Sequence, residues 1–311
     1  MDVGNPLISV IMPAYNAAEF IEEAIDSILN QTYSHLELLI CDDGSNDETL
    51  KVIQSFKDDR IKLFQNIQNL GNLKTTNFLF EECKGDFITI QDADDYSLPN
   101  RLEILLNAFD SDIELEMVGT NYLAVSENKT PLFSGFLPRK DLQIRTIAEK
   151  EVVPMLYASI MVRANLLKKV GGFRLFFNRL GYADFDWMAR CMESSQRALN
   201  LRDVLYIYRK HTHSFTAKKK KNSLLVMFHP LIVEMHKRRG NGLEDYFETN
   251  NIVQIKRMVS QMYIAKAKAN FWDRKGAVFS YLWKSIIFNP RNVDSYRTLF
   301  YILRNRNDKN Q

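Results

Sequence analysis

The sequence predicts an α/β fold, in which a mostly parallel sheet is flanked by helices and followed by a helical C-terminal region. Short apolar runs alternate with helical stretches through the first hundred residues, which is typical of βαβ units. Polar residues gather directly after three of those apolar runs. Beyond about residue 218 the chain changes to basic, amphipathic segments. Together these observations indicate two parts with different architectures.

Four strands separated by helices are expected in the first hundred residues. Each expected strand is a short run rich in aliphatic and β-branched residues, and each expected helix has apolar residues three and four positions apart. The strands are predicted at residues 7–12, 36–41, 61–64 and 86–92, with the first closed by Pro13. The helices are predicted at 17–30, 47–56 and 72–83. Right-handed crossovers should connect the parallel strands.

The rest of the chain is less regular. After residue 100 we expect strands at 117–125 and 158–163, a short helix ending before Gly171, and a helix through Ser194. Residues 126–152 read as a polar connection with a helix near 140–148, and 199–208 as two short strand pieces. The C-terminal region predicts helices at 222–239, 251–269, 275–288 and 293–304.

Composition and terminal sequence favour a cytoplasmic protein. No run of about 18 apolar residues occurs, so no transmembrane helix is expected. The N-terminus lacks the basic start and apolar core of a signal peptide. Cys41, Cys83 and Cys191 are far apart, which predicts reduced thiols rather than disulfides or a zinc site.

Charge is distributed unevenly along the 311 residues. Residues 201–311 contain 22 Lys and Arg against 8 Asp and Glu, a net charge of +14, which leaves −11 for residues 1–200. The basic region is expected to contact an anionic surface: the inner face of the cell membrane, the acidic front of its own chain, or a second copy in a homodimer. No nucleic-acid-binding motif is present, so no nucleic-acid partner is expected.

Three carboxylates follow the strand predicted at 86–92, in the sequence Asp92-Ala93-Asp94-Asp95. Unpaired carboxylates are costly to bury, so the chain should leave the core here, at the sheet edge where α/β proteins bind ligands. Hard oxygen ligands suit Mg²⁺ or Mn²⁺, which commonly accompany substrate phosphates. The alternative is a polar strand end before a helix that begins at Pro99.

Two other loops should lie at the same edge, Pro13 to Asn16 and Asp42 to Ser45. A nucleotide would be bound there. The first loop contains neither a Gly-x-Gly-x-x-Gly pattern nor a P-loop, so neither a dinucleotide-binding protein nor a nucleotidyltransferase is supported.

Several of these segments resemble family 2 glycosyltransferases of the GT-A fold. The similar segments are 8–16, 27–33, 37–49, 69–72 and 92–95, and the resemblance covers roughly residues 6–215. It implies a Rossmann-like GT-A catalytic domain at 1–217, with a nucleotide-sugar half at about 1–98 and an acceptor half at about 99–217. Residues 218–311 would form a separate basic helical region. It also implies inverting transfer of a sugar from a nucleotide donor, usually with a divalent metal.

The resemblance assigns candidate roles to individual residues. Nucleotide-sugar binding is expected of Pro13, Ala14, Tyr15, Asn16, Asp42, Asp43, Gly71, Asp92 and Ala93. Mn²⁺ or Mg²⁺ is expected at Asp94, with Asp95 and His211 as further ligands. Asp184 matches the family's general base, although Ala183 replaces the Glu that usually precedes it. The expected donor is a UDP-sugar, and the expected acceptor is a glycan or lipid-linked glycan of surface polysaccharide synthesis.

Simpler interpretations stand beside these roles. Asp184 or Asp186 could cap the helix that follows them, and for Asp186 a cap or a structural hydrogen bond is favoured. His211 could be an ordinary surface histidine. The replacement of Glu by Ala183 leaves a second functional class open: a GT-A-like binding module without catalysis that acts at a membrane or partner surface.

Overall fold

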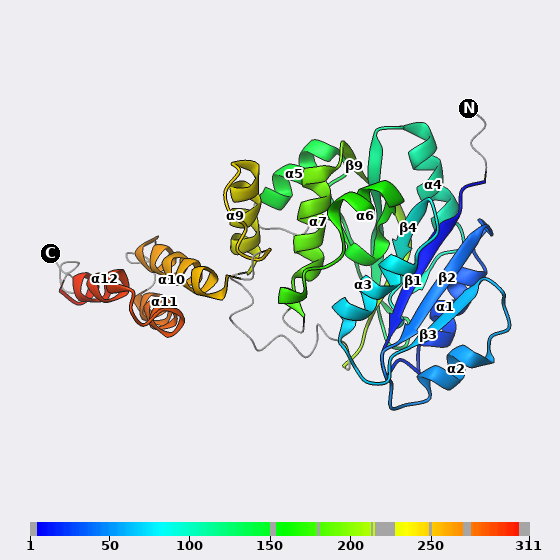
Figure 1. Ribbon diagram of the computed structural model, residues 1–311, viewed down its shortest axis with the longest axis horizontal. Coiled ribbons are helices and arrows are strands. Elements are labelled where there is room, and N and C mark those ends of the chain that lie inside the picture. The colour runs from blue at the N-terminus through cyan, green and yellow to red at the C-terminus, as the bar shows by residue number, and fades with distance from the viewer. Residues whose placement is uncertain are drawn as a thin grey trace. The chain divides into compact units, whose positions relative to one another are not determined.

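The computed structural model describes residues 5–149, 154–178, 181–212, 214, 228–248, 251–269 and 275–304. The chain divides into two compact units, Met1–Leu225 and Val226–Gln311 (Figure 1). The domain boundary predicted after residue 217 falls outside the described residues and stays a prediction.

The first unit is built on one sheet. Its described strands are β1 (Ile8–Ala14), β2 (Leu36–Asp42), β3 (Ile61–Gln65), β4 (Phe87–Ile90), β5 (Tyr96–Ser97), β6 (Leu115–Ser126), β7 (Pro131–Gly135), β8 (Met161–Arg163) and β9 (Arg197–Lys210). Their order is β3-β2-β1-β4-β8-β6-β9-β5, with β7 paired to β6. Strands β1 to β4 are parallel, while β5, β7 and β8 pair antiparallel with their neighbours. The predicted α/β class is confirmed.

Helices flank this sheet (Figure 1). Those described are α1 (Ile21–Leu29), α2 (Thr49–Ser55), α3 (Asn72–Glu82), α4 (Arg101–Ser111), α5 (Asp141–Glu149), α6 (Ala164–Val170) and α7 (Ala183–Ser194). The apolar stripes of α1 and α4 pack into one buried cluster with β1 and β2, including Ile25, Leu105 and Val10. Removing these side chains from water is the main favourable term in folding. It holds the parallel strands in register.

The register brings the three predicted loops to one edge. Ala14 pairs with Asp42, and Ile11 pairs with Ile90. The chain therefore leaves β1, β2 and β4 on the same side of the sheet. Two boundaries differ from the prediction: Pro13 lies inside β1, paired with Cys41, and β4 ends at Ile90 rather than at residue 92.

Three other elements differ from expectation. The two pieces predicted at 199–208 are one strand, β9, whose register against β6 shifts where exposed Arg202 and Asp203 interrupt the apolar pattern. Strand β7 was expected to be loop; its residues are exposed or nearly so, and they show no apolar alternation. The strand predicted at 158–163 begins instead as a 3₁₀ turn, η1 (Tyr157–Ser159).

The second unit is helical. Its described helices are α9 (Phe228–Gly240), α10 (Ile252–Ala269), α11 (Lys275–Phe288) and α12 (Val293–Arg304). The last three match the predicted ranges closely, while residues 222–227 of the helix predicted at 222–239 lie outside the described residues. Ala267, Val278 and Leu282 form a small core, and buried hydroxyls of Ser260, Ser285 and Ser295 bond to one another. None of the described helices is long and apolar enough to cross a bilayer.

Candidate active site

Asparagine and serine side chains join the loops after β1 and β2. The amide of Asn16 donates to Ser45 Oγ at 2.9 Å, and Asn16 Oδ1 accepts from the amide of Asn46 at 2.9 Å. Asn16 adopts a left-handed conformation with φ +49°, which asparagine tolerates better than most residues. Tyr15 remains exposed beside this junction. These hydrogen bonds therefore hold together two loops that are far apart in the sequence.

Asp42 and Asp43, at the end of β2, are both buried. Asp43 accepts hydrogen bonds from the amides of Leu70 and Gly71, both at 2.9 Å, and from Asn66 Nδ2 at 2.8 Å. Gly71 has φ +94°, and a Cβ there would lie 2.6 Å from Asn178 Oδ1. A larger residue would therefore be strained both by this backbone conformation and by the close contact. These contacts give Asp43 and Gly71 a role in shaping the loop, while nucleotide binding by them stays a prediction.

Asp94 and His211 meet across the end of the sheet. His211 Nε2 lies 2.8 Å from Asp94 Oδ2, and the Phe20 ring packs against the imidazole with centroids 4.9 Å apart. The Asp94 side chain is 34% exposed and that of His211 is 7% exposed, so the imidazole is fixed while the carboxylate can reach a ligand. His211 is therefore not an ordinary surface histidine.

Asp95 has different surroundings from Asp94. It is buried, and it accepts hydrogen bonds from Tyr206 Oη at 2.9 Å and from the amide of Arg209 at 2.7 Å. Burial, with the nearby charges of Asp94 and Asp92, raises its pKa well above the usual range. These contacts give Asp95 the role of fastening the loop to β9. Metal ligation by Asp95 stays a prediction.

Two buried arginines that sequence reasoning missed support this loop. Arg209 Nε donates to the Asp94 carbonyl at 3.0 Å, and its Nη2 donates to Glu23 of α1 at 2.5 Å. Arg101, fully buried on α4, donates to Thr89 Oγ1 at 2.7 Å and to the carbonyl of Ala158 at 2.8 Å. Burial lowers the pKa of Arg101 to about 10. The one sequence signal is the place of Arg209 two residues before His211; nothing in the sequence around Arg101 distinguishes it from solvent-exposed arginines.

Asp92 lies near both a metal-binding candidate, Asp94, and the candidate base, Asp184. Burial, together with the negative charges of Asp94 and Asp184, raises its pKa to about 7. An effect from both residues requires both carboxylates to be near Asp92. The structure therefore brings Asp94, in the loop after β4, and Asp184, in α7, near the same residue, although they lie 90 positions apart in the sequence.

Helix α7 presents Asp184 in its first turn. The helix begins at Ala183, and its N-cap is Tyr182, which has φ +66° and makes no capping hydrogen bond through its side chain. The cap interpretation is therefore wrong for both Asp184 and Asp186. Asp184 Oδ1 accepts the amide of Phe185 at 2.9 Å. Ala183 is buried, so the position where the family resemblance implies Glu is packed against the protein.

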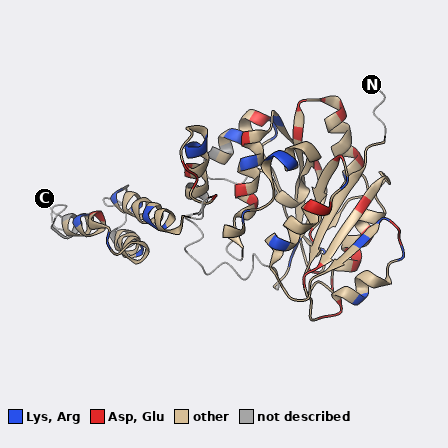
Figure 2. Ribbon diagram, in the orientation of Figure 1, with Lys and Arg blue, Asp and Glu red and all other residues tan. Residues whose placement is uncertain are grey.

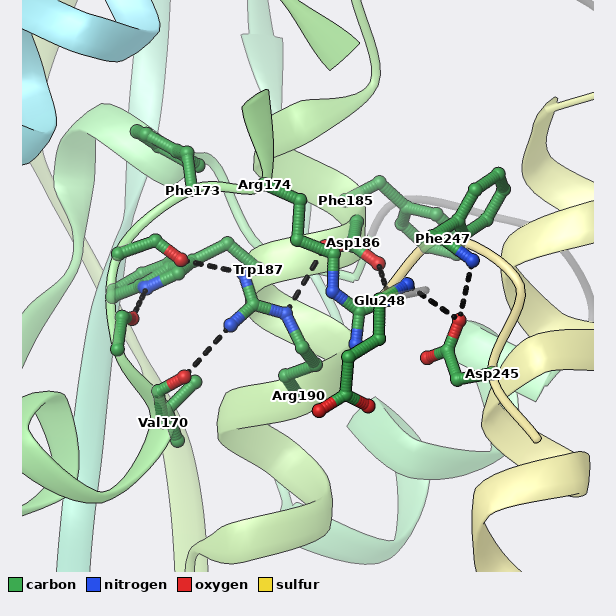
Figure 3. Close-up of polar contacts among 12 residues, drawn as sticks. Val170, Phe173, Arg174, Phe185, Asp186, Trp187, Arg190, Asp245, Phe247 and Glu248 are labelled. Carbon is green, nitrogen blue, oxygen red and sulfur yellow. Dashed lines mark hydrogen bonds and ion pairs between the residues drawn. The ribbon is translucent and has the colours of Figure 1, made fainter. Parts of the chain in front are cut away.

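Asp186 anchors α7 through a buried ion pair, as Figure 3 shows. Arg190 Nε lies 3.0 Å from Asp186, and Arg174 Nη1 lies 3.4 Å away. Arg190 also donates to the carbonyls of Val170 and Gly172 at 2.8 and 2.7 Å. The expected structural hydrogen bond is confirmed in the form of an ion pair. It holds α7, and with it Asp184, against the end of α6.

Replacing Asp186 with alanine is expected to lower the free energy of unfolding by about 3–5 kcal/mol, because two arginines would stay buried without their counter-charge. Denaturant unfolding measures the change. The control is Asp112→Ala, which breaks a solvent-exposed pair with Arg197 and should cost far less because water screens it. Equal losses in the two variants would contradict an anchoring role for Asp186.

The residues present fit a divalent cation. A carboxylate and an imidazole are suitable ligands for Mn²⁺, and the buried His211 Nδ1 has no hydrogen-bond partner among the described residues. Within the described ranges, no three His, Cys, Asp or Glu side chains converge as a complete ligand set. A cation at Asp94 and His211 would therefore need further ligands, which water or a bound diphosphate could supply.

The chain matches known proteins over this same region. The family model described as glycosyl transferase family 2 matches residues 9–171. The Bacillus subtilis (strain 168) protein named "Putative glycosyltransferase EpsE" is 32% identical over 217 residues, covering 68% of this chain and 75% of that protein. The Escherichia coli protein WfgD, a UDP-Glc:alpha-D-GlcNAc-diphosphoundecaprenol beta-1,3-glucosyltransferase, is 42% identical over 101 residues, 32% of this chain and 40% of that protein.

Solved structures agree on the fold. S. aureus TarS 1-349 in complex with UDP-GlcNAc superposes with a TM-score of 0.63 at 17% identity, covering 90% of this chain and 81% of that one. The sheet and its flanking helices have the GT-A glycosyltransferase fold. This chain belongs to glycosyl transferase family 2.

Proposed function

We propose that this glycosyltransferase moves a sugar from a UDP-sugar to a glycan or lipid-linked glycan of surface polysaccharide synthesis, with inversion at the anomeric carbon. The observation that carries the proposal is the gathering of Asp94, His211 and Asp184 around Asp92. A UDP-sugar is supported by the names of WfgD and of the TarS complex, and a lipid-diphosphate acceptor by the name of WfgD.

In the proposed mechanism, Asp184 accepts the proton of the attacking acceptor hydroxyl as that oxygen bonds to the anomeric carbon. The bond between this carbon and the diphosphate oxygen breaks on the opposite face, and UDP leaves with the bonding electrons. The mechanism uses one carboxylate base and no covalent nucleophile, so it predicts inversion. Tyr15, Asn16, Asp42 and the loop held by Asp43 would bind and orient the nucleotide.

Asp94 and His211 would hold Mn²⁺ or Mg²⁺ against the diphosphate. A bound cation supplies Lewis-acid stabilisation of the charge on the leaving phosphate. Arg209 keeps the Asp94 backbone in place through its hydrogen bond to the carbonyl oxygen, and Asp95 ties the same loop to β9. The chain's own residues thus position the ligands before substrate arrives.

A donor screen tests the proposed function. The full-length protein is incubated with Mn²⁺ and a panel of UDP-, GDP-, dTDP- and CMP-sugars, and release of the nucleotide is measured with and without glycan acceptors. Release of UDP from at least one UDP-sugar, above the level with Asp184→Asn, is expected. Preference for a donor with another nucleotide would contradict the UDP proposal, and no release from any donor would contradict catalysis.

We further propose that the C-terminal unit attaches the enzyme to the anionic inner face of a membrane. Helices α10, α11 and α12 contain eight Lys and Arg and a single acidic residue, Asp294 (Figure 2). Trp283, Ile287 and Phe300 are 66%, 60% and 69% exposed. Basic residues near an anionic surface gain about 1 kcal/mol each, and exposed aromatic and aliphatic residues can insert between lipids.

Sedimentation with liposomes checks this attachment. Binding should increase with the anionic lipid fraction and decrease between low and physiological salt, because salt screens surface charge beyond about 8 Å. Reversing three exposed charges in α10, by Lys256→Glu, Arg257→Glu and Lys268→Glu, should abolish binding. The matched control reverses exposed Lys51, Lys57 and Lys84 in the first unit and should leave binding unchanged. If the protein stayed in the supernatant under all these conditions, membrane attachment would be wrong. The basic unit would then serve to dock on the first unit of its own chain or to form a homodimer.

A further inference from the structure

Tyr157 occupies a place in the fold that the functions above do not use. It begins the 3₁₀ turn η1, whose next residue, Ala158, accepts a hydrogen bond from Arg101 through its carbonyl at 2.8 Å. Arg101 also bonds to the Ile90 carbonyl at 3.1 Å, the last residue of β4. Arg101 therefore holds η1, which begins at Tyr157, beside the end of β4, where the loop containing Asp92, Asp94 and Asp95 starts.

Aromatic side chains hold the Tyr157 ring on its other side. The ring is perpendicular to that of Trp187, with centroids 5.8 Å apart, and packs against Phe173 at 5.3 Å. Figure 3 shows Trp187 and Phe173 at the end of α7 that carries Asp186. Trp187 is three residues from Asp184, so the two lie on the same face of α7. Tyr157 thus lies between the end of β4 and the first turn of α7.

The hydroxyl of Tyr157 is buried and has no hydrogen-bond partner among the described residues. Leaving a buried polar group unpaired is destabilising. Burial raises the pKa of this hydroxyl well above its usual range, and the charges of Asp92 and Asp184 add to the increase. The hydroxyl is therefore a neutral donor lying near both carboxylates.

We propose that Tyr157 Oη donates a hydrogen bond to a hydroxyl of the transferred sugar, so that Tyr157 is a binding residue for the donor's sugar ring. This inference rests on the proposed function. In that function the sugar lies between the diphosphate, held near Asp94, and the base Asp184. A hydroxyl that arrives with the sugar would supply the partner that the ligand-free protein lacks. The nucleotide, bound by the loops after β1 and β2, would not contact Tyr157.

Tyr157→Phe separates this role from a packing role, because it removes only the hydroxyl. A packing role predicts no loss in either stability or activity. The proposal predicts an unchanged or raised melting temperature together with weaker binding of the sugar. Calorimetric Kd values are measured for UDP, UDP-glucose and UDP-N-acetylglucosamine. We expect the Kd of UDP to stay within about twofold of wild type, and the Kd and kcat/KM of the UDP-sugar that wild type uses to worsen about tenfold, the scale of one hydrogen bond.

Tyr263 provides a matched control. Its hydroxyl is likewise buried without a described partner, but it lies in the second unit, where its ring stacks on Tyr281 and Phe288. Tyr263→Phe should match wild type in UDP-sugar affinity and kcat/KM.

Three results would overturn the assignment of Tyr157: unchanged sugar affinity in Tyr157→Phe, a lower melting temperature, or an equal loss of affinity for UDP. If wild type released no UDP from any UDP-sugar, the proposed function would fail. The comparison of UDP with UDP-sugar binding would still decide the role of Tyr157.

Discussion

Replacing Asp184 with asparagine is expected to lower turnover by about 10²-fold or more, the usual scale for loss of a general base. Asparagine has nearly the same shape, and its amide oxygen can still accept the amide of Phe185 that now bonds to Asp184 Oδ1. It cannot take a proton from the acceptor hydroxyl. Initial rates at saturating donor and acceptor measure the effect, and calorimetry with UDP should give an unchanged Kd.

The control for this variant is Asp203→Asn, an exposed aspartate on β9, which should retain the wild-type rate. Loss of UDP affinity together with turnover in Asp184→Asn would move Asp184 from the acceptor side to the donor site. The configuration of the product provides an independent check by NMR. A product that keeps the donor's anomeric configuration would rule out direct displacement.

Asp94→Asn is expected to reduce activity to well below about a tenth of the wild-type rate. The neutral amide keeps the size of the side chain but loses the charge that a divalent cation requires. The fold should be unaffected, because the Asp94 side chain is 34% exposed and the loop is held through its backbone carbonyl and through Asp95. Rates are measured across a titration with Mn²⁺ and with Mg²⁺, alongside a thermal melt.

The metal titration distinguishes a ligand from a residue that only orders the loop. If Asp94 is a ligand, the variant should need much more Mn²⁺ for half-maximal activity, whereas Asp203→Asn should not. A variant that keeps more than about a tenth of the wild-type rate, at most roughly 1.4 kcal/mol of barrier, would remove Asp94 from the metal site. A variant that needs the same Mn²⁺ concentration as wild type for half-maximal activity would also remove Asp94 from the metal site.

Local patterns were sufficient for the loops that follow β1, β2 and β4. A buried parallel strand needs an apolar run, and polar residues that follow it directly must leave the sheet at its C-terminal edge. This reasoning predicted that Asp42, Asp92 and Asp94 lie at one edge, and the strand register agrees. The same reasoning could not predict which residues within a loop are exposed and which are buried. Asp94 and Asp95 are adjacent and chemically identical, yet one is partly exposed and the other is buried.

The sequence by itself determined the class of the sheet, the helices of the second unit and the loops in which the site residues lie. These features depend on the period of apolar residues and on neighbours a few positions away. The tertiary structure alone decided which of those residues work together: His211 with Asp94, Arg209 with the Asp94 carbonyl, and Arg101 with η1. Each pair joins residues more than 50 positions apart in the sequence. Such contacts arise from the packing of whole elements, and no local pattern records them.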